Sequence, residues 1–183
     1  MGTRERLLEN GAALFAAKGF HGVGVEELGE SVGLTGPSMY RHFRTKSALL
    51  AEMLITVSQS LLEGATEVIG DNLDPRETLA ALINRHVEFA LTYPDLIRVH
   101  ERDFGNLEED DARQVRRLQR RYVELWVEQI LRVRRNVNAE SARTMAHAVF
   151  GLLNSTPRLR SGQHRTDVAE LMAGLAQRAL MSQ

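Results

Sequence analysis

Cysteine is absent from the 183-residue sequence, and aromatic residues make up only 5% of it. Without cysteine the chain has neither disulfide bonds nor thiolate ligands for a metal. The formal net charge is -1, so the chain has no overall basic character. It opens without the pattern of a signal peptide, and no continuous apolar run approaches the roughly 18 residues of a membrane span. We therefore expect a cytoplasmic protein with no membrane partner.

Strand patterns are also scarce, whereas residues that begin and end helices are frequent. Asp74, Pro75 and Glu77 combine an N-cap, a first-turn proline and a capping-box glutamate, which together predict a helix start. Thr45 is placed to cap the long apolar stretch that follows it. The sequence predicts an all-α fold with about nine helices, over residues 3–18, 25–32, 36–43, 46–69, 75–93, 95–104, 109–135, 139–155 and 167–181.

One short stretch concentrates the cations that the chain as a whole lacks. Residues 34–50 read LTGPSMYRHFRTKSALL and contain Arg41, Arg44 and Lys46 but no acidic residue. Taken alone, such a cluster is usually a solvated surface. Its place in the chain is what indicates a binding function.

The cationic stretch lies in the second half of a predicted helix-turn-helix. Residues 25–32 form the first helix, residues 33–35 the turn, and residues 36–43 the second helix. Gly33 supplies the unusual backbone angles of the turn, and Gly29 keeps the contact side of the first helix small. The second helix is then a recognition helix, whose N-terminal residues point at the base edges of DNA. The neighbouring cations supply the charge that phosphate neutralisation needs.

The spacing of this segment resembles that of one family. From Gly19 to Leu49 the chain follows the pattern G-F-x-x-x-x-V-x-x-L-x-x-x-x-G-L-T-x-x-x-x-Y-x-H-F-x-x-K-x-x-L. This pattern is similar to the DNA-binding domain of the tetracycline-repressor (TetR/AcrR) family. The resemblance implies a DNA-binding domain over residues 1–48 and a ligand-binding and dimerisation domain over residues 49–183. It also implies a homodimeric regulator, usually a repressor that a small ligand releases from DNA.

The resemblance implies a set of DNA-binding residues as well. Those expected at the DNA backbone are Thr35, Tyr40, His42 and Lys46, and those expected nearest the bases are Pro37, Ser38 and Arg41. Gly36 is a further DNA-binding candidate. Two departures from the family pattern concern the first helix of the motif. Val23-Gly24 stands where relatives usually carry hydroxyl residues, and Gly29 stands where they usually carry alanine. We expect Gly29 to cost about 0.5–1 kcal/mol of helix stability.

Two histidines of the second domain lie on apolar helix faces. They are either satisfied interior histidines or polar anchors in an apolar ligand pocket, as small-molecule sites are usually built. His86 has no second metal ligand three or four residues away and His100 has only Asp103, so we expect no metal, and we expect no cofactor. With the aromatic residues nearby, the candidate effector site comprises His86, Phe89, Tyr93, His100, Tyr122 and Trp126.

Five arginines between Arg113 and Arg121 form one broad face of a helix. They are either a solvated face that pairs with acids at four-residue spacing, or a cationic site for an anionic ligand such as an acyl coenzyme A thioester. The sequence leaves both interpretations open.

The last two helices are apolar on more than one side. An apolar helix pair at a chain terminus needs more cover than one domain face gives, and pairing with its copy yields an isologous four-helix bundle. The operator DNA is then a pseudo-palindrome. The predicted dimer-interface residues are Ala142, Met145, Ala146, Val149, Phe150, Leu153, Leu171 and Leu175.

These features predict a DNA-binding transcriptional regulator that responds to a small-molecule effector. The long helix 46–69 begins at the DNA-binding segment and runs into the second domain, so we expect it to couple the two. A DNA-binding protein without a ligand is one alternative. An enzyme is another, although the sequence has no nucleophile elbow, zinc-binding helix or phosphate-binding glycine loop.

Overall fold

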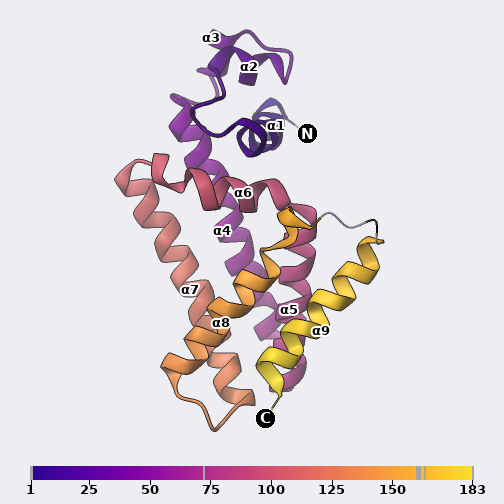
Figure 1. The fold of residues 1–183 in the computed structure, drawn as a ribbon. Helices are drawn as coiled ribbons and strands as arrows, with labels where there is room; N and C mark the ends of the chain where they lie inside the picture. The colour runs from indigo at the N-terminus through magenta and orange to yellow at the C-terminus, as the bar shows by residue number, and fades with distance from the viewer. Residues whose placement is uncertain (1, 72, 160–161, 163, 183) are drawn as a thin grey trace. The chain divides into compact units, whose positions relative to one another are not determined.

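The computed structural model describes residues 2–71, 73–159, 162 and 164–182, and helices are the only regular elements within them (Figure 1). The α-helices are α1 (Thr3–Lys18), α2 (Val25–Glu30), α3 (Gly36–Met39), α4 (Lys46–Gly70), α5 (Pro75–Thr92), α6 (Pro94–Asp103), α7 (Glu109–Val133), α8 (Ala139–Leu153) and α9 (Arg165–Met181). Two short 3-10 helices are η1 (Phe104–Asn106) and η2 (Thr156–Arg158). The predicted all-α fold is confirmed.

Two predicted helix starts show the expected capping bonds. The Asp74 carboxylate accepts from the backbone N–H of Arg76 at 2.8 Å and of Glu77 at 3.2 Å, just before α5 begins. Thr45 Oγ1 accepts from the N–H of Ala48 at 2.9 Å, at the start of α4. Side-chain oxygens thus satisfy backbone donors that have no partner inside the helix.

The recognition helix is shorter than predicted. The segment expected over residues 36–43 is α-helical only to Met39. Beyond it, the N–H groups of Tyr40, Arg41 and His42 bond to carbonyls three residues back instead of four. This tightening into 3-10 geometry is a common way for a helix to end.

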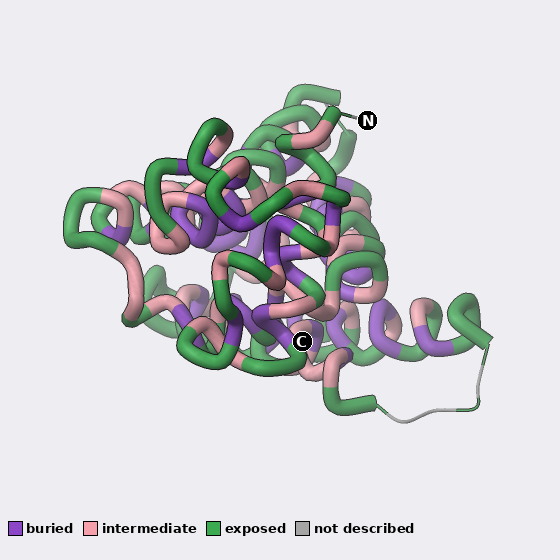
Figure 2. Tube along the Cα trace, turned by 90° about the horizontal axis from the view of Figure 1, so that it is seen from above, coloured by how far each residue is buried: buried purple, intermediate pink, exposed green. Residues whose placement is uncertain are grey.

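The chain packs as two compact units, one of Met1–Ser58 with Asp95–Arg116 and the other of Gln59–Pro94 with Arg117–Gln183. The first unit therefore holds α6 and the start of α7 beside the helix-turn-helix. The functional boundary expected after residue 48 stays a prediction, and packing groups the chain differently. Within each helix, buried positions alternate with exposed ones, as amphipathic packing requires (Figure 2).

The first unit has its own hydrophobic core. Each of its segments contributes side chains that are fully or nearly fully buried, namely Leu7, Phe15, Leu28, Met39, Phe43, Leu49, Leu50, Leu54, Val99 and Val115. Val99 on α6 and Val115 on α7 come from distant parts of the chain. The helix-turn-helix therefore shares a core with residues far from it in sequence.

Helix α4 is the one described helix that is long and apolar enough, by length and composition, to cross a membrane. A core helix of a globular protein meets the same criteria. Leu50 and Leu54 of α4 are completely buried in the first unit, and Leu62 is buried in the second. Its apolar character is therefore accounted for by packing.

The second unit is built around α5, α7, α8 and α9. Its largest fully buried side chain is Trp126 of α7, and α5 and α9 pack closely against each other. Six of the eight residues predicted at a dimer interface lie on α8, where Ala142, Ala146, Val149 and Leu153 belong to this core. Met145 and Phe150 are half-buried, whereas Leu171 and Leu175 on α9 are exposed.

A polar network lies inside this core. His86 is only 3% exposed, and both of its ring nitrogens have partners at 3.0 Å: the Tyr122 hydroxyl at Nδ1 and Asn154 Oδ1 at Nε2. An amide oxygen only accepts, so Nε2 carries the proton and Nδ1 accepts from the Tyr122 hydroxyl. Burial lowers the pKa of His86 to about 4, an effect that the bond to Asn154 opposes. Burial also raises the pKa of Tyr122. Both groups are therefore neutral near pH 7.

The buried histidine makes stability depend on pH. The unfolded chain binds a proton at His86 near pH 6.5, whereas the folded chain binds it only near pH 4, so stability falls as the pH drops through this window. The loss is about 2 kcal/mol between about pH 7.5 and pH 5. Urea unfolding at the two pH values measures it. In His86→Gln this component disappears, whereas the exposed-site control His147→Gln keeps it; an equal pH dependence in both variants would contradict the assignment.

Candidate nucleic-acid interface

The turn between α2 and α3 is a Schellman-type helix end. Gly33 has a φ of 77°, in the left-handed region that favours glycine. The N–H of Gly33 bonds to the carbonyl of Glu30 at 3.0 Å, and the N–H of Leu34 bonds to that of Gly29 at 2.9 Å. The predicted role of Gly33 is confirmed, and the bonds stop α2 at a defined residue.

The two helices of the motif approach each other at backbone distance. A Cβ atom added at Gly29 would lie 2.9 Å from the carbonyl oxygens of Leu34 and Thr35. One added at Gly36 would lie 3.1 Å from Cα of Glu26. Alanine at position 29 would therefore push the turn away, an effect that outweighs its higher helix propensity. The expected cost of Gly29 is corrected accordingly: in this chain glycine is what permits the contact.

The start of α3 combines small and exposed residues. Thr35 occupies the N-cap, but its hydroxyl bonds to the hydroxyl of Ser38 at 2.8 Å and not to a backbone N–H. Pro37 follows in the first turn and is exposed. Gly36 is buried against α2, as its close contact requires. The first turn thus presents a hydroxyl pair and a proline ring on a surface of small side chains.

Beyond this turn, apolar and cationic residues separate. Met39 and Phe43 are buried in the core of the unit, whereas Tyr40 is 52% exposed. Arg41 and Arg44 are also exposed, and His42 is half-buried. An aromatic hydroxyl and two guanidinium groups are therefore available to phosphates.

Other cations near the motif are engaged within the protein. Lys18 forms an ion pair with Glu27, and Arg4 pairs with Glu52 and lies 4.3 Å from the Phe43 ring centre. These contacts leave the exposed arginines at the end of the motif as its main available charge. Local placement, not bulk charge, therefore determines the electrostatic character of this face.

Lys46 has a structural role that the sequence did not predict. Its ammonium donates to the carbonyls of Phe20 and Val23, each at 2.7 Å, and lies 4.5 Å from the centre of the Phe20 ring. Two of its three N–H groups thus hold the turn between α1 and α2. Its expected phosphate contact stays a prediction and would depend on the remaining N–H.

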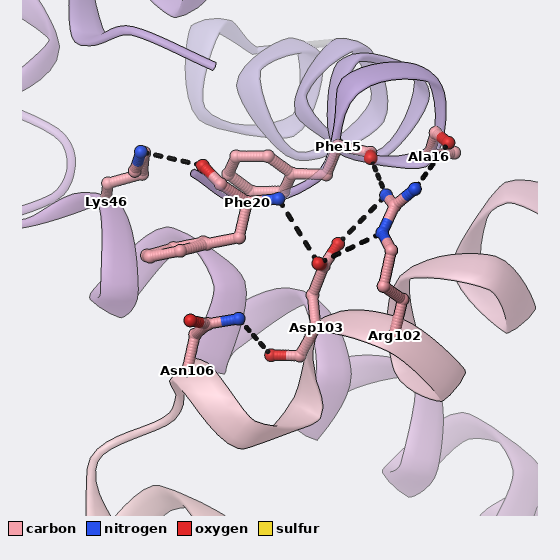
Figure 3. A network of polar contacts seen from close by, with 7 residues as sticks. All are labelled: Phe15, Ala16, Phe20, Lys46, Arg102, Asp103 and Asn106. Atoms are coloured by element: carbon pink, nitrogen blue, oxygen red, sulfur yellow. Dashed lines mark hydrogen bonds and ion pairs between the residues drawn. The ribbon is translucent and has the colours of Figure 1, made fainter. Parts of the chain in front are cut away.

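A polar network from α6 holds the same turn (Figure 3). The Asp103 carboxylate accepts from the N–H of Phe20 at 3.2 Å and from Nε of Arg102 at 3.1 Å. Arg102 also donates to the carbonyls of Phe15 and Ala16, at the end of α1. These residues were missed, although the sequence carried a signal. Asp103 lies one helical turn after the apolar Val99, on the same face of α6, where an acid indicates a buried partner.

The candidate effector residues divide between the two units. His86 lies among the rings of Tyr122, Trp126 and Phe150, with centre-to-centre distances between 5.1 and 6.0 Å. The indole N–H of Trp126 is buried and approaches the Tyr122 hydroxyl, but among the described residues it has no partner at ordinary hydrogen-bond geometry. Phe150, expected at a dimer interface, is therefore an unexpected member of this aromatic cluster.

The remaining candidates lie at its edge or elsewhere. Phe89 is 5.7 Å from the His86 ring and 5.9 Å from that of Tyr93, which is 52% exposed. His100 belongs to the first unit, where its ring lies 5.4 Å from that of Phe104. It stays a prediction as an effector contact.

The arginine face of α7 is only partly paired with acids. Arg113 forms ion pairs with Glu109 and Asp110, and Arg116 bonds to Glu109 at 3.0 Å. Three further arginines along this face, Arg117, Arg120 and Arg121, are exposed. The ion pairs favour a solvated face at Arg113 and Arg116. For the three further arginines, both a solvated face and an anion-binding site remain open.

The comparisons with known proteins match both parts of the chain. Residues 7–53 match the family model described as bacterial regulatory proteins of the tetR family, and residues 72–180 match the tetracyclin repressor-like C-terminal domain. Among curated relatives, the HTH-type transcriptional repressor KstR2 of Rhodococcus jostii is 32% identical over 87 residues. That stretch covers 48% of this chain and 43% of the repressor, so the likeness spans less than half of the relative.

Solved structures share the fold over nearly the whole chain. A TetR-family transcriptional regulator from Bordetella parapertussis has a TM-score of 0.85 at 23% identity, covering 94% of this chain and 93% of that one. AibR in complex with isovaleryl coenzyme A and operator DNA has a TM-score of 0.78 at 17% identity, covering 95% and 97%. At these identities the likeness shows the fold. The two family-model matches together with this fold place the chain in the TetR family of bacterial regulatory proteins.

Proposed function

We propose that this protein is a cytoplasmic, homodimeric transcriptional regulator that binds operator DNA, and that it is a repressor released by a small apolar or amphipathic effector. The observation that carries the proposal is the exposed surface of the helix-turn-helix. There a first turn of small residues is followed by Tyr40, Arg41 and Arg44. An enzymatic role has no comparable support. His86 and Tyr122, the two groups whose pKa burial shifts, are buried in the core and hydrogen-bonded to each other.

The geometry of the motif fits recognition of duplex DNA. Small residues at the start of α3 allow its backbone to come close to the base edges, as recognition helices require. The two arginines that follow are exposed and carry fixed positive charge, so Arg44 suits a phosphate contact and Arg41 suits the expected contact with a base edge. Lys46 is a poorer probe of DNA contact, because its removal would also release the turn that it holds.

Replacement of the two arginines separates the two kinds of DNA contact. In Arg44→Ala we expect weaker binding to all duplexes alike and a salt slope reduced by about one unit, because one phosphate contact is lost. In Arg41→Ala we expect a reduced preference for the selected operator. Fluorescence anisotropy with selected and random duplexes over a salt series measures both. Arg135→Ala, an exposed arginine of the other unit, is the control. If both Arg41→Ala and Arg44→Ala bind DNA like the parent, the interface is wrongly assigned.

The dimer proposal now depends mainly on α9. Leu171 and Leu175 are 51% and 37% exposed and lie one helical turn apart. Large apolar side chains so placed on a helix face indicate an interaction surface. The half-buried Met145 and Phe150 of α8 add apolar area in the same unit. A second copy of the chain would cover such a face by isologous pairing and would give the operator its two-fold symmetry.

Charge introduced on α9 tests this pairing. In the double variant Leu171→Lys/Leu175→Lys we expect a folded monomer by sedimentation equilibrium at micromolar concentration. It should bind a palindromic operator at least about tenfold more weakly, because the two half-sites are no longer read together. Leu73→Lys, an exposed leucine in the loop before α5, should leave the dimer intact. A parent protein that sediments as a monomer contradicts the proposal directly.

The aromatic cluster of the second unit supports the effector proposal. Its rings surround His86 and leave the Trp126 indole N–H without a completed hydrogen bond, so a ligand acceptor oxygen would improve the site. The structural relative AibR binds isovaleryl coenzyme A. We therefore propose acyl coenzyme A thioesters as the first ligand class to test. Helix α4, which contributes residues to both units, would carry the effect to the DNA-binding segment.

Trp126 is the only tryptophan, and its fluorescence reports on the cluster. Titration with short-chain acyl coenzyme A thioesters should change this fluorescence and weaken operator binding, with a coupling of about 1–3 kcal/mol between the two sites. Free coenzyme A, which carries the phosphates, tests binding to the arginine face of α7. The free acids, which carry the acyl group, test binding to the aromatic cluster. Trp126→Phe removes the fluorescence signal but should keep operator binding, and the thioester concentration that weakens operator binding should change. If no thioester changes fluorescence or operator affinity, this ligand class is excluded.

A further inference from the structure

The turn between α1 and α2 determines where the helix-turn-helix begins. Helix α1 ends at Lys18 and α2 starts at Val25, with Gly19 at a φ of 79° between them. Because α2 and α3 meet at the backbone beside Gly29, we treat them as one block, the α2–α3 block. The orientation of this block relative to α1 therefore depends on the turn.

Charged side chains from two distant helices hold the backbone of this turn (Figure 3). At Phe20, the N–H donates to the Asp103 carboxylate of α6 and the carbonyl accepts from Lys46 of α4. Lys46 also bonds to the carbonyl of Val23, next to the N-cap of α2. The two ends of the turn are thus fixed by charge-assisted bonds, which are stronger than neutral ones.

Arg102 extends this grip to the end of α1. Its guanidinium donates to the carbonyls of Phe15 and Ala16, in the last turn of the helix. A cation there is favoured by the helix dipole, and it adds a second bond to the Phe15 carbonyl, which already accepts from the N–H of Gly19 at 2.8 Å. The same guanidinium bonds to Asp103 through Nε and Nη2, each at 3.1 Å. The Arg102–Asp103 pair therefore joins the end of α1 to the first residue after the turn's glycine.

Asp103 is the central member of the network. Its side chain is 5% exposed, so its charge is acceptable only because Arg102 and the Phe20 N–H meet it. Asn106 donates to its backbone carbonyl at 3.1 Å, and the carbonyl of Asn106 accepts from Ser47 Oγ at 3.0 Å. The end of α6 is therefore anchored to the start of α4 as well, which fixes the carboxylate in place.

We infer that Asp103 and Arg102 are positioning residues for DNA recognition. They hold the α1–α2 turn so that the α2–α3 block presents its first turn to the bases, although they themselves lie outside the helix-turn-helix. This inference rests on the proposed DNA-binding function. It adds two residues that are not among the expected DNA contacts. A released turn would leave the exposed arginines free to meet phosphates, whereas the fit of the block to base edges would be lost.

The test compares selected and random DNA. In Asp103→Ala we expect the affinity for the selected operator to fall about tenfold or more, and the affinity for a random duplex to change less than about twofold. Only binding to the operator depends on how the α2–α3 block fits the base edges. In Asp103→Asn an amide oxygen remains for the Phe20 N–H, so the loss should be smaller. Glu108→Ala, an exposed acid beyond η1, is the matched control. Binding is measured well below the melting temperature of each variant.

A spectroscopic readout separates positioning from a general loss of stability. In amide NMR spectra, the Phe20 signal should move upfield in both Asp103 variants, while signals of Gly33 and Thr35 inside the block stay in place. If Asp103→Ala does not fold, Arg102→Gln replaces it, since Arg102 is half-exposed. It should show the same selective loss of operator affinity.

The outcomes are distinguishable from failure of the proposed function. A parent protein without preference for any duplex overturns the DNA-binding proposal itself. A parent with such a preference, which the folded variants retain in full, overturns the positioning role alone. Equal loss for selected and random DNA also overturns it, because that result indicates a smaller fraction of folded protein.

Discussion

The close approach of α2 and α3 is the constraint on which the DNA-binding face depends. The carbonyl oxygens of Leu34 and Thr35 lie only 2.9 Å from the position that a Cβ atom at Gly29 would take, so there is no room for a side chain between the two helices. The same contact buries Gly36 and directs the first turn of α3 outward. The α2–α3 block is therefore closely packed without a large core of its own. The chain has to orient that block from outside, which explains why charged residues far away in sequence converge on the turn before it.

The cations of the first unit serve two separate purposes. Lys46 and Arg102 direct their donors to backbone carbonyls, and Arg4 meets Glu52. Arg41 and Arg44 remain exposed. The net charge of -1 thus conceals a local group of exposed arginines at one end of the motif, separate from the exposed arginines of α7. Such placement would attract DNA locally in a protein that has no overall basic charge.

Local features of the sequence predicted more than distant ones did. The helix-turn-helix was recognisable because its determinants, such as Gly33 and the α4 cap at Thr45, act within a few residues. The Arg102–Asp103 network joins residues more than 80 positions apart, and no periodicity reveals such a pairing. The aromatic cluster was found only in part, since Phe150 fitted an apolar helix face that suited either a core or an interface. An apolar stripe indicates that a side chain is covered, and only tertiary packing decides by what.

The packing of the second unit restricts the effectors that the proposed site would accept. Both nitrogens of His86 are already bonded, and its low pKa keeps it uncharged near pH 7. It therefore offers no charge to an anionic group, and a carboxylate or phosphate placed against it would be desolvated without compensation. The Trp126 N–H is the buried donor there that still lacks a partner among the described residues. The part of an effector that enters this cluster should consequently be apolar, with a neutral acceptor oxygen, while any anionic part has to remain in solvent or meet exposed arginines. A thioester satisfies both conditions, because its acyl end is uncharged and its phosphates are remote from it.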